Sequence, residues 1–364
     1  MARLLTPRML RRGFELSILI SLLAFVAILL YGNDLDAFLS SLGRIHWPWL
    51  LLGVGVAALD WIGGGLRLWI TARVIHPETP LGGAIMAGGM SAWAGYLTPV
   101  QSGNGPMLIY TLRRYGVPMP VALTAALMTF IATIVFFAIV GPLAIALGAG
   151  RSLGEHGNIL GLSLYDLFLG SLSVFAGVGL VLVVIIAFPH LARDLIRRIS
   201  DSLGRRSARI AAGLETFQAG VDRAHAAVVA FNSPRGWLAV FWAMLLTAIS
   251  HANKLLAGYI TLRALGISVN FMDVLLLQTL IMFMLYFAPT PGGAGLAEVL
   301  SALVMGVYVP RELTPVYIIV WRFIVIYLTI IAGSVVFSHW VRKGLKGIEE
   351  ADPIVPAPVS QGGA

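Results

Sequence analysis

The chain has 364 residues, of which 58% are hydrophobic and only 12% charged, and this balance excludes a soluble protein of one or two domains. The net charge of +8 could indicate a nucleic-acid partner, but the arginines cluster outside the apolar runs and no basic stretch carries a nucleic-acid motif. We therefore assign the excess charge to the cytoplasmic side of a membrane. Cysteine is absent, which rules out disulfides, thiolate metal sites and a cysteine nucleophile.

Apolar runs along the chain predict an all-α polytopic membrane protein with about six full spans. The first run follows several arginines, but it is long for a secretory signal core and no small-residue cleavage site follows it. We interpret it as the first span, with both termini of the protein in the cytoplasm. The six runs long enough to cross a bilayer are residues 14–31, 47–75, 117–147, 164–188, 236–265 and 315–341.

Two further apolar stretches, residues 81–114 and 271–309, are interrupted by residues that cannot continue a helix. In lipid, irregular backbone is tolerated only where protein buries it or where it lines a polar cavity. We therefore predict two broken, re-entrant hairpins whose tips bind a substrate. The tip residues assigned to this site are Thr98, Pro99, Gly103, Asn104 and Gly105 in the first hairpin and Thr290, Pro291, Gly292 and Gly293 in the second.

A five-residue sequence similarity relates the two hairpins. WITAR at residues 69–73 and YITLR at residues 259–263 each lie at the end of a span, just before a hairpin. The basic flanks place the first hairpin on the cytoplasmic side and the second outside. We therefore predict an inverted repeat, with repeat A at about 47–148 and repeat B at about 236–342, within one transmembrane domain of residues 1–350. Such repeats are typical of transporters, which bind substrate where the broken segments meet.

The segment between the repeats, residues 189–235, carries a series of arginines with apolar residues recurring at threes and fours. This pattern predicts a basic amphipathic segment that lies along the anionic lipids of the inner leaflet. The alternative is an arm that binds a partner protein. Residues 351–364 are rich in proline and glycine and are expected to be disordered. A homo-oligomer is compatible with the sequence, and no nucleic-acid partner is expected.

Charges within the spans or beside a tip are functional candidates, because a charge is costly at membrane depth. Arg67, Lys254 and Arg322 would attract a phosphate headgroup, while Glu298 would pair with one of them or take up a proton. The structural alternative is that these charges only pair with one another to hold the spans together. For two further polar residues, Asp60 and His251, we favour that alternative. The three glycines at 63–65 are interpreted as close-packing positions between helices.

Several of these residues together resemble the lysylphosphatidylglycerol synthase transmembrane (flippase-like) family, over residues 14–346. They are the second tip from Pro289 to Glu298, the first tip from Leu97 to Pro106, the stretch Tyr110-x-x-Arg113-Arg114-x-Gly116-Val117, and Arg322. Many members have Gly-Glu and a downstream Glu-Arg where this chain reads Gly105-Pro106 and Met128-Thr129, so a headgroup preference does not carry over.

The resemblance implies lipid translocation across the inner membrane of a bacterium or archaeon. Bifunctional members add a soluble aminoacyl transferase domain, which this sequence does not contain, so lipid synthesis is not expected. Members are associated with aminoacylated phosphatidylglycerol, hopanoids and polyprenyl-linked glycolipids, and the substrate identity therefore stays open.

The sequence thus favours a lipid flippase without catalytic residues, metal or cofactor. No ATPase, metalloprotease or hydrolase motif is present, so transport would be passive or coupled to protons or membrane potential, with Glu298 as the proton carrier. One alternative is a membrane-embedded enzyme or enzyme subunit acting on a lipid-linked substrate, with Glu298 and His251 as acid and base. Another is a membrane scaffold that holds a cytoplasmic partner through the basic segment.

Overall fold

The computed structural model describes residues 7–30, 35–43, 45–147, 158–159, 162–187, 231–286 and 288–351, together with isolated positions between 188 and 230. Apart from a two-residue antiparallel pair, β1 (Asn158–Ile159) with β2 (Leu162–Ser163), the regular structure of these residues is helical. The α-helices are α1 (Pro7–Leu30), α2 (Leu35–Leu42), α3 (Trp47–Ile75), α4 (Leu81–Tyr96), α5 (Asn104–Arg114), α6 (Met119–Ala146), α7 (Leu164–Ala187), α10 (Pro234–Ser250), α11 (Ala252–Ala264), α12 (Phe271–Tyr286), α13 (Leu296–Met305), α14 (Thr314–Arg322) and α15 (Leu328–Ala351). Most of the predicted amphipathic segment 189–235 and the tail beyond Ala351 lie outside the described residues.

Four of the six predicted spans are confirmed as helices long and apolar enough to cross a membrane. At the other two positions α1 and α7 are helical, with shorter apolar segments at Ile18–Leu30 and Leu172–Val181. The described chain is thus that of a polytopic, all-α membrane protein, while the full number of crossings stays a prediction. The four long segments are Trp47–Ile75, Met119–Ala144, Pro234–Ala264 and Arg311–Lys343.

Local sequence explains where these helices begin and bend. α10 starts at Ser233, whose Oγ accepts a hydrogen bond from the Gly236 N–H (3.1 Å), with Pro234 in the first turn. The last span is interrupted by a π-helical segment, η5 (Phe323–Tyr327), which disturbs the regular carbonyl pairing of an α-helix. The Asn253 side chain donates to the Val325 carbonyl in this segment (3.1 Å) and so satisfies an acceptor in the buried interior.

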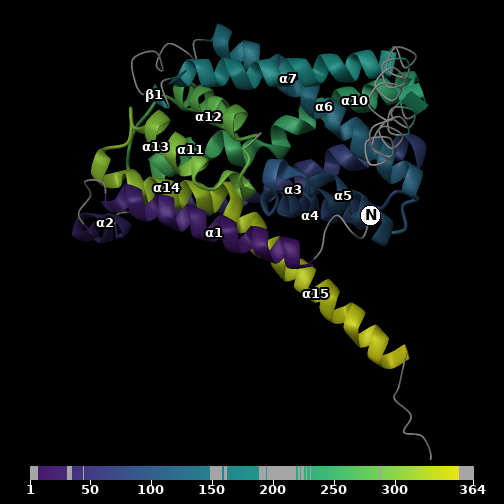
Figure 1. The fold of residues 1–364 in the computed structure, drawn as a ribbon, viewed down its shortest axis with the longest axis horizontal. Coiled ribbons are helices and arrows are strands. Elements are labelled where there is room, and N and C mark those ends of the chain that lie inside the picture. Colours follow the sequence, from purple (N-terminus) through teal and green to yellow (C-terminus); the bar gives the residue numbers. More distant parts are fainter. Residues whose placement is uncertain are drawn as a thin grey trace, which may run out of the picture.

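Both predicted hairpins are broken at the predicted positions. In the first, α4 is followed by a 3₁₀ turn, η1 (Pro99–Gln101), and by α5; in the second, α12 is followed by η3 (Pro291–Gly293) and α13. α4 packs against α5 and α12 against α13, so each stretch folds back on itself. Figure 1 shows the blue helices α3 to α5 beside the green helices α11 to α13, with α7 along one edge and α15 projecting from the body.

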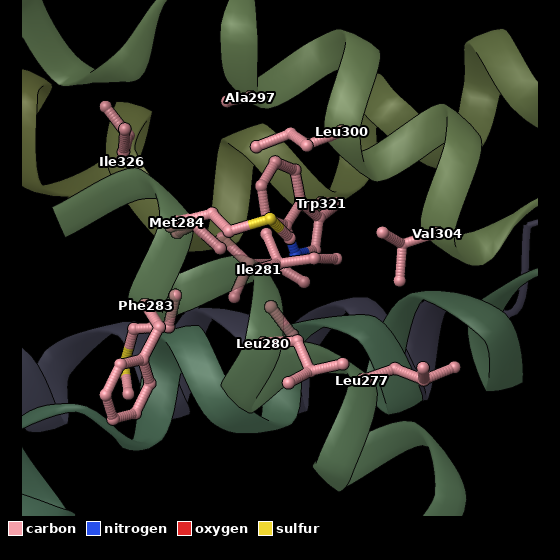
Figure 2. Packing of buried hydrophobic residues seen from close by; sticks show 14 of the residues in the cluster. Leu277, Leu280, Ile281, Phe283, Met284, Ala297, Leu300, Val304, Trp321 and Ile326 are labelled. Carbon is pink, nitrogen blue, oxygen red and sulfur yellow. The ribbon is translucent and has the colours of Figure 1, made fainter. Parts of the chain in front are cut away.

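The apolar core joins the second hairpin to the last span. Leu277, Leu280 and Ile281 of α12 are buried together with Leu300 of α13 and Trp321 of α14 (Figure 2). α3 lies at the centre of the other half, where it packs against α4, α10 and α11. Elements that come from distant parts of the chain therefore pack around both hairpins.

Candidate functional site

The two tips follow the same backbone course. Thr98 and Thr290 are extended (φ −127°, ψ 145° and φ −96°, ψ 149°), and each precedes a proline that opens a 3₁₀ turn. A residue before proline is sterically pushed out of the helical region, which explains why both helices stop here. The Thr98 hydroxyl donates to the Ala94 carbonyl (2.8 Å) and the Thr290 hydroxyl to the Ala294 carbonyl (2.8 Å), so each threonine closes its own tip.

The two residues after each proline adopt left-handed conformations. In the second tip these are Gly292 (φ 59°) and Gly293 (φ 68°), whereas in the first they are Val100 (φ 52°) and Gln101 (φ 52°). Glycine takes this conformation readily, but a side chain costs about 1–2 kcal/mol there. The first tip is therefore a strained copy of the second.

The tips touch each other. The Val100 N–H donates to the Ala288 carbonyl (3.1 Å), which joins the first tip to the segment just before the second. The Gly103 N–H donates to the Thr98 hydroxyl (2.8 Å), so the return helix of the first hairpin is fixed to the same tip. The predicted meeting of the two broken segments is thus present in the structure.

Two adjoining cavities lie where the tips meet. The larger reaches the second tip at Thr290, Gly292 and Gly293, and the smaller reaches Asp60 and Arg67 on α3. Because both cavities share several lining residues, we treat them as one space and name it the central chamber. The shared residues are Tyr96, Gln101, His251, Lys254 and Tyr286.

Asp60 and Lys254 form an ion pair in the chamber. Lys254 Nζ lies 3.6 Å from Asp60 Oδ1, and the Tyr96 hydroxyl donates to Asp60 Oδ2 (2.7 Å). Lys254 Nζ also lies 5.4 Å from the centroid of the Tyr96 ring. The two charges of this pair compensate each other, which is the structural alternative that the sequence favoured for Asp60.

Arg67 is the other cation of the chamber, and its contacts are different. Its Nη1 donates to the hydroxyls of Thr133 (2.7 Å) and Thr247 (3.4 Å), and among the described residues Arg67 makes no ion pair. Its Nε is also buried and has no hydrogen-bond acceptor among the described residues. His251 lies near Arg67's partner Thr247, with Nδ1 2.9 Å from the Thr247 carbonyl oxygen. Arg67 therefore supplies a positive charge that no carboxylate compensates by direct contact.

The structure places Glu298 and Arg322 away from the chamber, although the sequence predicted one site for all four charges. Arg322 Nε lies 2.9 Å from Glu298 Oε1, and both side chains are almost fully buried (1% and 2% exposed). Arg322 also donates to the Gly292 carbonyl (2.9 Å) and to the Ser21 hydroxyl (3.0 Å), and Glu298 Oε2 accepts from the Gly295 N–H (2.8 Å). The pair fixes the second tip to α14 and α1 from behind.

The remaining predicted tip residues have different surroundings. Asn104 lines the chamber, Pro291 and Gly103 are buried, and Pro99 is exposed. A Cβ at Gly105 would have no neighbour within 4 Å, so that glycine is not required for close packing. Except for Asn104, these residues shape the tips and do not line the chamber.

Sequence reasoning found the tip residues that line the chamber but missed four other uncharged residues there, Tyr96, Gln101, Gln278 and Tyr286. Tyr96 and Tyr286 are each the last residue of the helix that precedes a tip, and this shared position is a signal that could have found them. Gln278 interrupts the apolar run of α12 and lines the chamber, where its side-chain oxygen accepts from the Trp321 indole (2.8 Å). Gln101 contributes from the strained first tip.

Known proteins resemble this chain over most of its length. Residues 14–333 match the model of a family described as the lysylphosphatidylglycerol synthase TM region. A protein of Archaeoglobus fulgidus described as a UPF0104 membrane protein is 22% identical over 332 residues, which are 90% of this chain and 97% of that relative. The match to the family model confirms the resemblance seen in the tip motifs. The chain is a multi-pass membrane protein that belongs to the family of the lysylphosphatidylglycerol synthase transmembrane region.

Proposed function

We propose that this protein translocates a lipid with a phosphate-bearing headgroup across the cytoplasmic membrane, and that the headgroup crosses within the central chamber. The surroundings of Arg67 support this proposal most directly. Asp60 compensates Lys254 by direct contact, whereas Arg67 contacts no carboxylate among the described residues, so these three residues give the chamber an excess positive charge. A site of this kind favours an anion.

Physical chemistry makes such a site necessary for lipid translocation. A charged headgroup in hydrocarbon would cost several kcal/mol or more, and fixed cations and hydrogen-bond donors reduce this cost. The planar guanidinium group matches the oxygens of a phosphate, and the Nε of Arg67 has a hydrogen to donate. The inverted repeat predicted from the sequence, with tips entering from opposite sides, would let either face of the membrane reach the chamber in turn.

Three other sequence-based ideas have less support. Glu298 as proton carrier would first have to leave its contacts, since Oε1 faces Arg322 and Oε2 accepts from the Gly295 N–H. The acid–base pair of the enzymatic alternative is not assembled, because His251 lines the chamber and Glu298 lines another cavity. The scaffold alternative depends on residues 189–235, most of which lie outside the described chain.

The proposal is tested in reconstituted vesicles with a fluorescent phosphatidylglycerol whose outer-leaflet label is quenched by dithionite. Wild-type protein should accelerate the movement of the label between leaflets. Arg67→Met should slow it at least tenfold, because a hydrogen bond to a charged group contributes about 1.5–3 kcal/mol. Arg342→Met, which removes an exposed arginine near the end of the last span, serves as the matched control and should behave like wild type.

Size-exclusion chromatography would first establish that both variants are folded. A wild-type rate for folded Arg67→Met would refute the assignment of the headgroup to the chamber. A wild-type protein that moves neither phosphatidylglycerol nor a phosphatidylcholine control would contradict phospholipid translocation itself.

A further inference from the structure

A third cavity, of about 480 Å³, lies between α1 and the last span. We name it the α1 groove, defined by the lining residues from Ile18 to Phe25 of α1, those from Ile318 to Ile331 of α14, η5 and α15, and Glu298. Its lining is apolar except for Ser21, the Glu298–Arg322 pair and the hydroxyl of Tyr327.

The rim of the groove faces the surroundings of the protein. Ile18, Leu22 and Ile331 are 44%, 54% and 55% exposed, and Ile319 is 38% exposed. In a protein that spans a membrane, exposed aliphatic side chains at such positions meet lipid hydrocarbon. Water would find few partners along this lining, since a buried water needs two to four polar groups. The chemistry of the groove therefore fits a hydrocarbon chain.

The polar end of the groove is electrically balanced. Arg322 and Glu298 are in direct contact, and the remaining Arg322 donors reach the Ser21 hydroxyl and the Gly292 carbonyl. Unlike Arg67 in the chamber, Arg322 thus has a carboxylate partner and gives no excess charge to a ligand. A lipid in the groove would be recognised by its tail, whatever the charge of its headgroup.

The groove and the chamber lie on opposite sides of one partition. Trp321 and Val325 line the chamber, whereas their neighbours Arg322 and Phe323 line the groove. Gly292 also lines the chamber, and its carbonyl accepts from Arg322 on the groove side. α14, η5 and the second tip therefore separate a space lined by charged residues from an apolar one.

We propose that the α1 groove binds one acyl chain of a membrane phospholipid. Binding of the chain follows from the lining of the groove and is independent of transport. A role of the groove in transport rests on the proposed function. In that case the acyl chain would stay in the groove while the headgroup enters the chamber.

Photolabelling tests the proposal. Full-length protein is reconstituted into phosphatidylcholine vesicles that contain phosphatidylcholine with a diazirine on its acyl chain, and labelled residues are located by mass spectrometry. Groove residues should be labelled several times more than Ile139 and Leu143 of α6, which are equally exposed apolar residues (51% and 50%). Equal labelling at both places would show annular lipid only and would overturn the proposal, as would absence of label from the groove.

Filling variants make the test specific. Ile319→Trp should lower labelling of the groove several-fold, whereas Val335→Trp, at a 63% exposed position that does not line the groove, should leave it unchanged. Leu22→Trp places the same bulk on the α1 side, in case Ile319→Trp does not fold. Unchanged labelling in a folded filling variant would contradict binding in the groove.

Two further arms separate this proposal from the proposed function. Vesicles of phosphatidylglycerol, with the matching probe, should give the same labelling, and a several-fold preference for them would overturn recognition by the tail alone. Arg67→Met should label like wild type, because Arg67 lines the chamber and not the groove. Groove labelling without translocation by the wild type would refute the proposed function and leave the groove assignment standing.

Discussion

Among the charged residues of the chamber, Asp60 and Lys254 pair with each other. Their ion pair lies at the junction of α3 and α11, and Tyr96 adds a hydrogen bond from the first hairpin. The pair therefore contributes to packing, while Arg67, seven residues further along α3, contacts no carboxylate directly among the described residues. The Lys254 and Asp60 side chains are mostly buried (18% and 7% exposed), so removal of one leaves the other charge buried without its partner.

This arrangement predicts a marked non-additivity between substitutions. Lys254→Met should destabilise the protein by about 3 kcal/mol, because it leaves the Asp60 carboxylate buried without its cation. Adding Asp60→Asn should recover much of that loss, because no charge is then left alone. Thermal unfolding of both single variants and the double variant in detergent measures the coupling. Additive losses would show that the two charges are independent.

At the scale of the helices, α3 and α4 approach each other closely at their glycines. A Cβ at Gly65 would lie 2.3 Å from the Ile85 Cα, and a Cβ at Gly88 would lie 2.5 Å from the Gly65 nitrogen. The sequence-based interpretation of residues 63–65 as close-packing positions is confirmed at Gly65. This contact presses the first hairpin against the helix that carries Arg67, and it thereby positions one wall of the chamber.

Gly65→Ala should therefore destabilise the protein by about 1–3 kcal/mol, since backbone atoms have to move apart to admit the methyl group. Gly55→Ala is a matched control on the same helix, because a Cβ at Gly55 would have no neighbour within 4 Å. Melting temperatures in detergent should fall for Gly65→Ala alone. Equal melting temperatures for the two variants would show that the helices separate at no cost.

At the scale of the whole molecule, the two hairpins touch at their tips. The hydrogen bond from the Val100 N–H to the Ala288 carbonyl joins the tips, and Arg322 donates to the Gly292 carbonyl of the second tip from the opposite side. If a headgroup is to pass between the halves, this contact has to open. Translocation would then depend on the relative movement of the two hairpins.

A reversible cross-link tests that movement. The natural chain has no cysteine, so a Val100→Cys/Ala288→Cys variant would carry the only two thiols. Oxidation to a disulfide should stop translocation of the fluorescent lipid, and reduction should restore it. The single variants, treated with the same oxidant, control for other effects of oxidation. Unimpaired translocation with the disulfide verified by mass spectrometry would rule out opening at the tips.

The sequence by itself determined the membrane class, the family, the positions of the two broken tips and the presence of Arg67 and Lys254 near them. These properties are local, because hydropathy sets a span and a Thr-Pro pair disfavours continuation of a helix at either tip. Only the tertiary structure decided which charges share a space. Glu298 and Arg322 point toward α1, and Asp60 meets Lys254, because helix packing orients each side chain and selects partners that are distant in the chain. The same packing formed the α1 groove, for which no run of residues in the sequence gave a sign.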